Sequence, residues 1–222
     1  MIDALLVAIG ADSEGYRKIL SVQEGHNEDK AGWSEFLAYL KARGLKGVKL
    51  IISDACMGLY ESVGDYYPDA DWQCCMVHFH RNVANRVLST KVKEVARMLK
   101  AIYAQERRQS AMIKVSDICE KLREMKLPKA AELIEEKIEE TPRCYSFPDN
   151  HWVRIRTNNA LERIMREIRR RTRVVGTFPD GNSALMLVSA RLRHMSGTKW
   201  GAKRYLSMDE LYKQDLTQQQ SA

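Results

Sequence analysis

The sequence predicts a mixed α/β fold that contains a long all-helical insertion. Two observations lead to this prediction. Short apolar runs bounded by turn residues occur before residue 90, whereas apolar residues at helical spacing dominate from about residue 91 to 140. The composition agrees, because 45% hydrophobic and 29% charged residues in a chain of 222 are typical of a globular protein with a sizeable core.

Four strands and one helix are expected before residue 90. The strands are expected at residues 5–9, 16–22, 48–52 and 72–77. The first is apolar throughout, as in strands buried on both faces, and a turn joins it to the second, which predicts a hairpin. The helix should begin with Asn27 as its cap and end at Gly44. Because a buried strand needs a neighbour on each side, the first strand also predicts a further strand upstream that this chain lacks.

The rest of the chain is predicted to be helical. One helical face is formed by Val92, Val95, Leu99 and Ile102. Pro128 occupies a position typical of the first turn of a helix. Further helices are expected from Asn159 and over residues 184–195. Residues 218–222 are expected to be disordered. These patterns divide the chain into four parts. Residues 1–88 are the first part of the core, residues 89–142 a helical insertion, residues 143–196 the last part of the core and residues 197–222 a tail.

Charge and cysteine content narrow the class of protein. The net charge of +7 favours a polyanionic partner. Five scattered cysteines suggest no disulfide framework, which fits a reducing cytoplasm. No run approaches the roughly 18–20 apolar residues of a membrane span, and the first residues lack the cationic start of a signal peptide. We therefore expect no membrane partner.

Asp54 is the first candidate site residue, because it follows the third predicted strand directly. A carboxylate at the C-terminal end of a buried strand is where α/β folds place site residues. The alternative is that Ser53 and Asp54 cap the helix that follows. The local sequence leaves both interpretations open.

Glu162 is the second candidate, at the head of a row of arginines on a predicted helix. At about 100° per residue, one arc of about 60° carries Glu162, Arg166, Arg169 and Arg173. Residues 154–173 contain eight arginines and only two acids, an excess that suits a phosphate polymer. The alternative is structural: Asn159 and Glu162 have capping-box spacing, and Glu162 and Arg166 have ion-pair spacing.

Cys75 and His78 form the third candidate. Their spacing is that of half a zinc site, and His80 adds a further donor. Because no second Cys or His pair lies nearby, a structural role in orienting a loop is favoured. Trp72, just before them, is interpreted as a core aromatic residue.

Longer motifs resemble the bacterial Mutator-type insertion-sequence transposases over residues 4–195. In chain order they are Ala8-Ile9-Gly10, Trp33-x2-Phe36-Leu37, Leu45-x-Gly47-Val48, Ile52-Ser53-Asp54-Ala55-x2-Gly58-Leu59, Trp72-Gln73-x-Cys75-x2-His78-Phe79-x-Arg81-Asn82, Thr157-Asn158-x2-Leu161-Glu162-Arg163, Glu167-Ile168-Arg169-Arg170-Arg171-Thr172 and Val174-Val175-Gly176-x-Phe178-Pro179. Several long motifs in the right order make the resemblance specific.

The resemblance implies an RNase H-like catalytic domain with a mixed sheet, in which two Asp and one Glu bind Mg²⁺ or Mn²⁺. Such metals activate water or a DNA 3′-hydroxyl for attack on a phosphodiester. By motif, Asp54 matches the second Asp and Glu162 the final Glu, so both become expected catalytic metal ligands. Cys75 and His78 match the family's Cys-x2-His pair, and residues 89–142 match its helical insertion. The expected DNA contacts are Arg166, Arg169, Arg170 and Arg173.

Part of the family pattern is not found. The first catalytic Asp lies on a strand before the one that opens this chain, and neither Asp3 nor Asp12 occupies the matching place. The family's N-terminal region, which recognises element ends, is absent too, and Cys74 stands where an Arg is common. We therefore expect a C-terminal portion of a transposase that is inactive by itself.

The leading interpretation is a transposase of a DNA insertion element that cleaves and transfers strands of double-stranded DNA. When intact it is expected to be a homo-oligomer in the bacterial cytoplasm, associated with the nucleoid. The alternative from another class is a non-catalytic DNA-binding remnant that interacts with intact transposase. A third interpretation is a structural zinc module built on Cys75 and His78.

Overall fold

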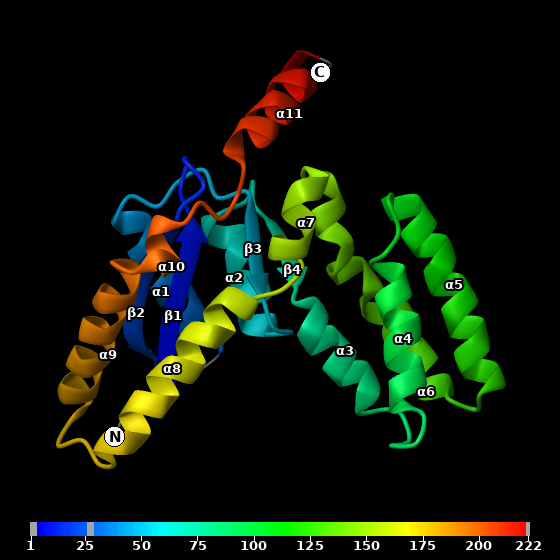
Figure 1. Ribbon diagram of the computed structural model, residues 1–222, viewed down its shortest axis with the longest axis horizontal. Coiled ribbons are helices and arrows are strands. Elements are labelled where there is room, and N and C mark those ends of the chain that lie inside the picture. The colour runs from blue at the N-terminus through cyan, green and yellow to red at the C-terminus, as the bar shows by residue number, and fades with distance from the viewer. Residues whose placement is uncertain (1–3, 26–28, 221–222) are drawn as a thin grey trace. The chain divides into compact units, whose positions relative to one another are not determined.

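The computed structural model describes residues 4–25 and 29–220 (Figure 1). The chain divides into two compact units. The first unit comprises Met1–Leu50, Cys56–Ala70 and Asn158–Ala222, and the second comprises Ile51–Ala55 and Asp71–Thr157. The predicted mixed α/β character is confirmed. Helices predominate in both units, and the strands are short.

The first unit is built on an antiparallel hairpin of β1 (Ala4–Ala11) and β2 (Arg17–Gly25), as predicted. The pairing skips Leu20, because Ala8 lies opposite Ser21 and Ile9 lies opposite Ile19. This bulge places one extra residue in β2. As a result Ile19 and Val22, which strict alternation would put on opposite faces, both contact the same core.

Two long helices cover that face of the hairpin. They are α8 (Asn159–Val175) and α9 (Gly181–Ser196), and they are packed against each other, against β1 and against β2. The buried centre consists of Ile164, Ile168, Val188 and Leu192. Alternate side chains of β1, Leu5, Val7 and Ile9, pack onto it. The apolar side of α8, with Ile164 and Ile168, is therefore the contact that orients this helix.

Helices α1 (Lys30–Ala42) and α2 (Met57–Tyr66) form a second packed pair in this unit. The cap of α1 is Asp29, whose carboxylate accepts the backbone N–H of Gly32 at 2.9 Å. The predicted cap, Asn27, lies outside the described residues. The helices approach closely at Gly58, where a Cβ atom would lie 2.7 Å from the backbone nitrogen of Lys30.

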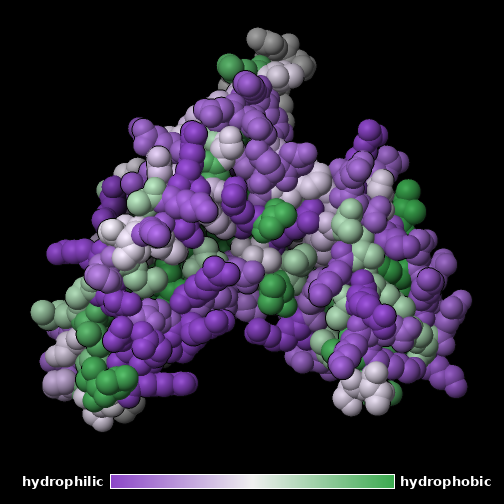
Figure 2. Space-filling model, in the orientation of Figure 1, coloured by the Kyte–Doolittle hydropathy of each residue, from purple (hydrophilic) through white to green (hydrophobic). Residues whose placement is uncertain are grey.

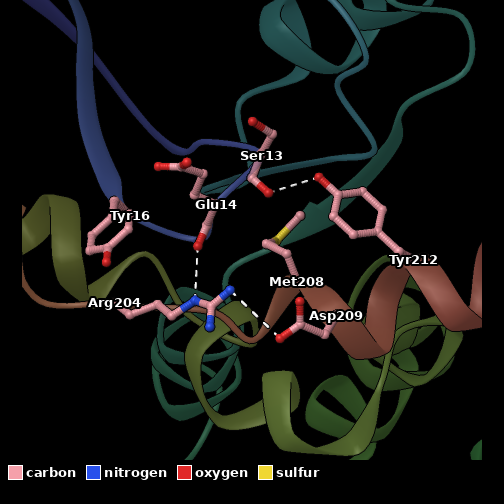
Figure 3. A pocket seen from close by; sticks show the side chains of 7 residues that line it. All are labelled: Ser13, Glu14, Tyr16, Arg204, Met208, Asp209 and Tyr212. Atoms are coloured by element: carbon pink, nitrogen blue, oxygen red, sulfur yellow. Dashed lines mark hydrogen bonds and ion pairs between the residues drawn. The ribbon is translucent and has the colours of Figure 1, made fainter.

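The C-terminal segment is attached to the hairpin turn, and its last helix extends to residue 220. The expected disorder of residues 218–222 is therefore wrong for 218–220, whereas 221–222 lie outside the described residues. It contains α10 (Lys199–Ala202) and α11 (Met208–Gln220). The backbone N–H groups of Tyr205 and Leu206 donate to the carbonyl of Gly15 at 2.7 and 3.1 Å. Figure 3 shows the open pocket of about 410 Å³ at this contact, where the Tyr212 hydroxyl donates to the carbonyl of Ser13 at 2.7 Å. The turn supplies the backbone acceptors that a sequence pattern does not display.

The second unit contains the other two strands, β3 (Leu50–Ser53) and β4 (Asp71–Cys74). In the described part of the chain they pair with each other and form a two-stranded sheet separate from that of β1 and β2. The expectation that residues 72–77 form a strand was wrong at its end, because helix α3 (Met76–Ala84) starts there. The backbone N–H of Cys75 still donates to the carbonyl of Ser53 at 2.6 Å.

Helices make up the remainder of the second unit. They are α3, α4 (Val92–Ile102), α5 (Arg108–Glu124), α6 (Pro128–Lys137), α7 (Asp149–Ile155) and the short 3₁₀ segments η1 (Ile138–Glu140) and η2 (Pro142–Ser146). Their core includes Leu99, Ile118, Leu122 and Ile134, each at most 2% exposed, and Pro128 begins α6 as predicted. The fully buried amide of Gln73 donates to the carbonyl of Ile155 at 2.6 Å and accepts the N–H of Cys144 at 2.7 Å. These bonds tie β4 to the segments that close the unit.

Within residues 4–25 and 29–220, none of the helices has the length and apolar character that a membrane crossing requires.

Candidate functional site

Asp54 lies directly after β3, in an exposed bend of the second unit. Its position is fixed through Ser53. The Ser53 hydroxyl donates to the backbone carbonyl of Asp54 at 2.7 Å, and the indole N–H of Trp72 donates to that same hydroxyl oxygen at 2.9 Å. The helix that follows has Cys56 at its N-cap and no side-chain cap. The capping alternative for Asp54 is therefore not supported, and its carboxylate points into solvent-accessible space at a strand end.

Trp72 has a second role that the sequence did not reveal. It is buried, as expected of a core aromatic residue, with 8% of its surface exposed. Its N–H is also the donor that holds the Ser53 hydroxyl. The paired strands β3 and β4 bring the two residues together. The only sequence signal was that Trp72 lies in the strand predicted after Asp54.

Glu162 lies in the first turn of α8, in the first unit. The N-cap of this helix is Asn158, whose carbonyl accepts the backbone N–H of Glu162 at 3.0 Å. Asn159 is therefore already a helical residue. The spacing of Asn159 and Glu162 does not make a capping box, since that motif requires its first residue at the N-cap. Glu162 is half-buried.

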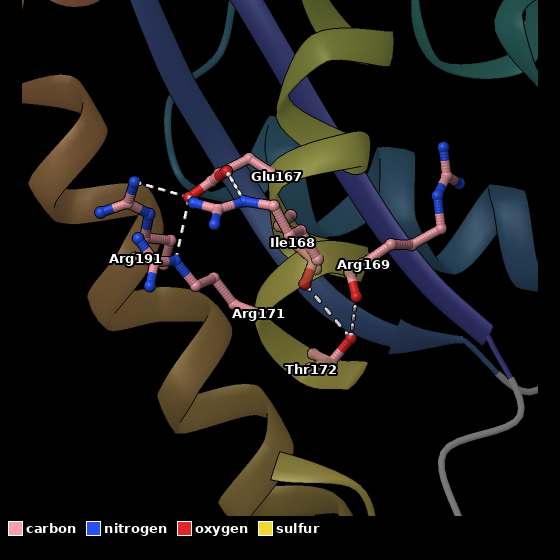
Figure 4. Close-up of polar contacts among 7 residues, drawn as sticks. Glu167, Ile168, Arg169, Arg171, Thr172 and Arg191 are labelled. Carbon is pink, nitrogen blue, oxygen red and sulfur yellow. Dashed lines mark hydrogen bonds and ion pairs between the residues drawn. The ribbon is translucent and has the colours of Figure 1, made fainter. Parts of the chain in front are cut away.

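The arginines of α8 separate into two groups, and the first surrounds Glu167 (Figure 4). The Glu167 carboxylate accepts hydrogen bonds from Arg170 at 2.9 Å, from Arg171 at 3.1 Å and from Arg191 of α9 at 2.6 Å. Hydrogen bonds from Arg170, Arg171 and then Arg191 lower the pKa of Glu167 to about 2. Arg170, one of the predicted DNA contacts, thus has an intramolecular partner, and this cluster helps to hold α8 against α9.

The second group is the free arginine row, Arg166, Arg169 and Arg173. All three are exposed. Within the described chain none of them forms an ion pair. Figure 4 shows Arg169 extending away from Glu167, and Figure 2 shows a hydrophilic surface along α8. Three exposed guanidinium groups that form no ion pair with any described residue create a local positive potential along this side of α8.

Other acids near the hairpin do not add to these candidates. The Asp12 carboxylate accepts the backbone N–H groups of Glu14 at 3.1 Å and Tyr16 at 2.8 Å, and it pairs with Lys18 at 3.3 Å. It is therefore engaged in the β1–β2 turn. Asp3 lies outside the described residues.

Cys75 and His78 lie at the start of α3. Cys75 is completely buried and occupies the N-cap position, and His78 is in the first turn. Cys74 is also buried, which raises the pKa of its thiol to about 12. Among the described residues, no group of three or more His, Cys, Asp or Glu side chains comes together as a metal site. Since structural zinc needs four ligands, the zinc interpretation gains no support here.

The donor chemistry of Asp54 and Glu162 suits a different metal. Mg²⁺ retains several waters and is commonly bound by one or two carboxylates together with substrate phosphates, so it does not need a complete protein cage. Both residues offer hard oxygen donors, and Asp54 is exposed enough to bind a hydrated ion. Each of the two carboxylates, taken by itself, has the donor chemistry that suits Mg²⁺ or Mn²⁺.

A mixed α/β fold with an exposed acid at a strand end and an unneutralised arginine row on a helix is typical of proteins that act on nucleic acids. The chain belongs to a family of this class, the Mutator family of transposases, whose sequence model matches residues 1–201.

Curated relatives agree with this assignment. The chain is 36% identical over 211 residues to the transposase for insertion sequence element ISRM5 of Rhizobium meliloti, covering 95% of this chain and 53% of the relative. It is 38% identical over 206 residues to the IS1081 transposase of Mycobacterium tuberculosis, covering 93% of this chain and 49% of that relative. It is also 38% identical over 210 residues to the IS406 transposase of Burkholderia multivorans, covering 93% of this chain and 53% of that relative. The chain thus spans about half the length of these relatives.

Proposed function

We propose that this chain is the metal-binding and DNA-binding part of an insertion-element transposase with an RNase H-like catalytic domain. The observation that carries the proposal is the family match over residues 1–201, which includes Asp54, Glu162 and the free arginine row. Double-stranded DNA is the polyanion, and Mg²⁺ or Mn²⁺ is the metal. Bound by carboxylates, such a metal activates water or a 3′-hydroxyl for attack on a phosphodiester.

Each side chain has a distinct part in this proposal. Asp54 and Glu162 are metal ligands, and the hydrogen-bonded pair of Trp72 and Ser53 keeps the Asp54 bend in place. The free arginine row binds DNA phosphates, because guanidinium groups form charge-assisted hydrogen bonds to phosphate oxygens. Arg170 has a structural role instead, because it pairs with Glu167. Cys75, which is buried, and the half-buried His78 are structural residues of the strand-to-helix junction.

The test measures metal and DNA binding separately on the purified 222-residue chain. Mn²⁺ binding is followed by the loss of the free-ion electron paramagnetic resonance signal. Asp54→Asn and Glu162→Gln should each weaken Mn²⁺ binding at least tenfold and leave duplex affinity within twofold. The matched control is Asp69→Asn, which removes another exposed carboxylate and should change neither.

Duplex binding is followed by fluorescence anisotropy of labelled DNA at several salt concentrations. Replacing Arg166, Arg169 and Arg173 with Ala should lower affinity and flatten the dependence of log K on log salt by about 2 to 3, as expected when three phosphate contacts are lost. Duplex binding without site-specific Mn²⁺ binding would contradict the metal proposal and favour the non-catalytic remnant. A chain that binds neither would contradict the proposal as a whole.

A further inference from the structure

Helix α4 of the second unit has a basic face that the proposed function does not use. Its inner side buries Val95, Leu99 and Ile102. Its outer side carries the α4 basic row, Lys93, Arg97 and Lys100, all exposed. These positions follow the i, i+4, i+7 spacing, so at about 100° per residue they lie within about 60° of arc.

The α4 basic row contrasts with three cations of the neighbouring helix in forming no ion pair among the described residues, although Glu94 lies in the first turn of α4. On the neighbouring helix α5, Arg108 pairs with Glu139, Lys114 with Asp117 at 3.4 Å, and Arg123 with Glu135 at 2.6 Å. In the described part of the chain no ion pair involves Lys93, Arg97 or Lys100. The α4 basic row is distinctive because its three cations, unpaired within the described residues, share one exposed arc of a single helix.

The charge distribution along the chain shows the same contrast. Residues 81–100 contain six basic residues and one acidic residue, whereas residues 101–157 contain eleven basic residues and ten acidic residues. His80, next to this region, adds no positive charge near neutral pH, because burial and then the Lys100 charge lower its pKa to about 4. The positive potential at α4 is therefore set by its permanent cations.

We propose that the α4 basic row is a second contact surface for duplex DNA, in addition to the free arginine row of α8. This inference rests on the proposed function, because both surfaces would bind the same partner. The row places three cations along about 10 Å of helix, at 1.5 Å per residue. Such a row suits an extended polyanion, since a duplex carries about one charge per 1.7 Å of its axis and many phosphates are within reach at once.

The experiment compares two triple variants of the second unit that remove the same net charge. The test variant replaces Lys93, Arg97 and Lys100 with Ala, and the control variant replaces the ion-paired Arg108, Lys114 and Arg123 with Ala. Anisotropy titrations with one labelled duplex at several salt concentrations should show at least a fivefold loss of affinity and a flatter salt dependence for the test variant alone. Equal behaviour of the two variants would overturn the inference.

Further variants separate this result from misfolding and from failure of the proposed function. Exchanging the three cations for one another, Lys93→Arg, Arg97→Lys and Lys100→Arg, keeps the charge and should restore affinity to within twofold of the original chain. If it does not, the loss is structural and the inference falls. If the α8 variant loses binding while the α4 variant matches its control, only the α4 surface is rejected. If the unmodified chain binds no duplex, the proposed function itself is rejected.

Discussion

At the scale of single residues, Glu167 distinguishes two groups of arginines on α8. Those that it binds have a structural role, and the free arginine row stays available to bind a partner molecule. Glu167 accepts from Arg170, Arg171 and Arg191, which joins two turns of α8 to α9. Without this acid, the guanidinium groups of Arg170, Arg171 and Arg191 would repel one another next to an apolar core. Glu167 thus offsets part of the positive charge of its three arginine partners, whereas the free arginine row forms no ion pair among the described residues.

Glu167 should make the stability of the first unit sensitive to acid. Its pKa is lowered from 4.5 to about 2 by hydrogen bonds from the arginines, so its contribution is complete above about pH 4.5 and is lost as the pH falls towards 2. In thermal melts between pH 6 and 2, Glu167→Gln should be less stable at pH 6 and show a shallower decline below pH 4.5. If the two proteins decline in parallel, the arginine cluster does not couple protonation to folding.

At the scale of elements, a single glycine sets how closely two helices pack. A Cβ atom on Gly58 would lie 2.7 Å from the backbone of Asp29 and of Lys30 at the start of α1. The Ser62 hydroxyl, one turn later in α2, lies 3.1 Å from the carbonyl of Lys30 and donates to it. The Gly-Leu pair in the motif after Asp54 therefore has a packing explanation, and it fixes α2 against α1.

Two glycines of α2 should respond to alanine in opposite directions. Gly58→Ala should destabilise the protein by about 1–3 kcal/mol, because the added methyl group forces the helices apart. Gly64→Ala should stabilise it by about 0.5–1 kcal/mol, since no atom lies within 4 Å of the new Cβ and alanine is the better helix former. Urea denaturation measures both changes. Stabilisation by both substitutions would mean that α1 and α2 are not in close contact.

At the scale of the whole molecule, the C-terminal segment is attached to the hairpin through backbone contacts. Gly15 has a φ of +86°, and its carbonyl accepts from both Tyr205 and Leu206. A Cβ atom there would lie 2.1 Å from the carbonyl oxygen of Leu206. Arg204 adds a hydrogen bond to the carbonyl of Glu14 at 2.9 Å. The turn and a segment nearly two hundred residues later are thus one structural feature.

Gly15→Ala should release this segment from the turn. The substitution combines backbone strain with the clash at Leu206, whereas the control Gly44→Ala, at φ +92° with nothing within 4 Å, carries strain alone. Hydrogen exchange of residues 203–216 should become at least tenfold faster in Gly15→Ala and stay near the original rate in Gly44→Ala. Unchanged exchange in both would show that the turn does not hold the segment.

The α/β character, the β1–β2 hairpin, the helical stretch after residue 91 and the family were all predictable, because they depend on local periodicity and on long ordered motifs. The end of β4 and the helices after residue 197 were not, since each depends on a partner distant in sequence. The cap at Asp29 was missed although its partner, Gly32, is only three residues away. Candidate ligands Asp54 and Glu162 were identified from motifs, and their roles stay predictions.

By itself, then, the sequence determined most of the helical and extended segments before residue 197 and the family to which the chain belongs. Only the tertiary structure decided which polar groups have partners. It assigned Arg170 to Glu167, the Trp72 indole to Ser53 and the acids beside α5 to its cations. Among the described residues it left the free arginine row and the α4 basic row exposed and without ion pairs. The physical reason is that periodicity reports burial along one element, whereas a hydrogen bond or an ion pair requires two side chains that folding brings within about 3 Å of each other.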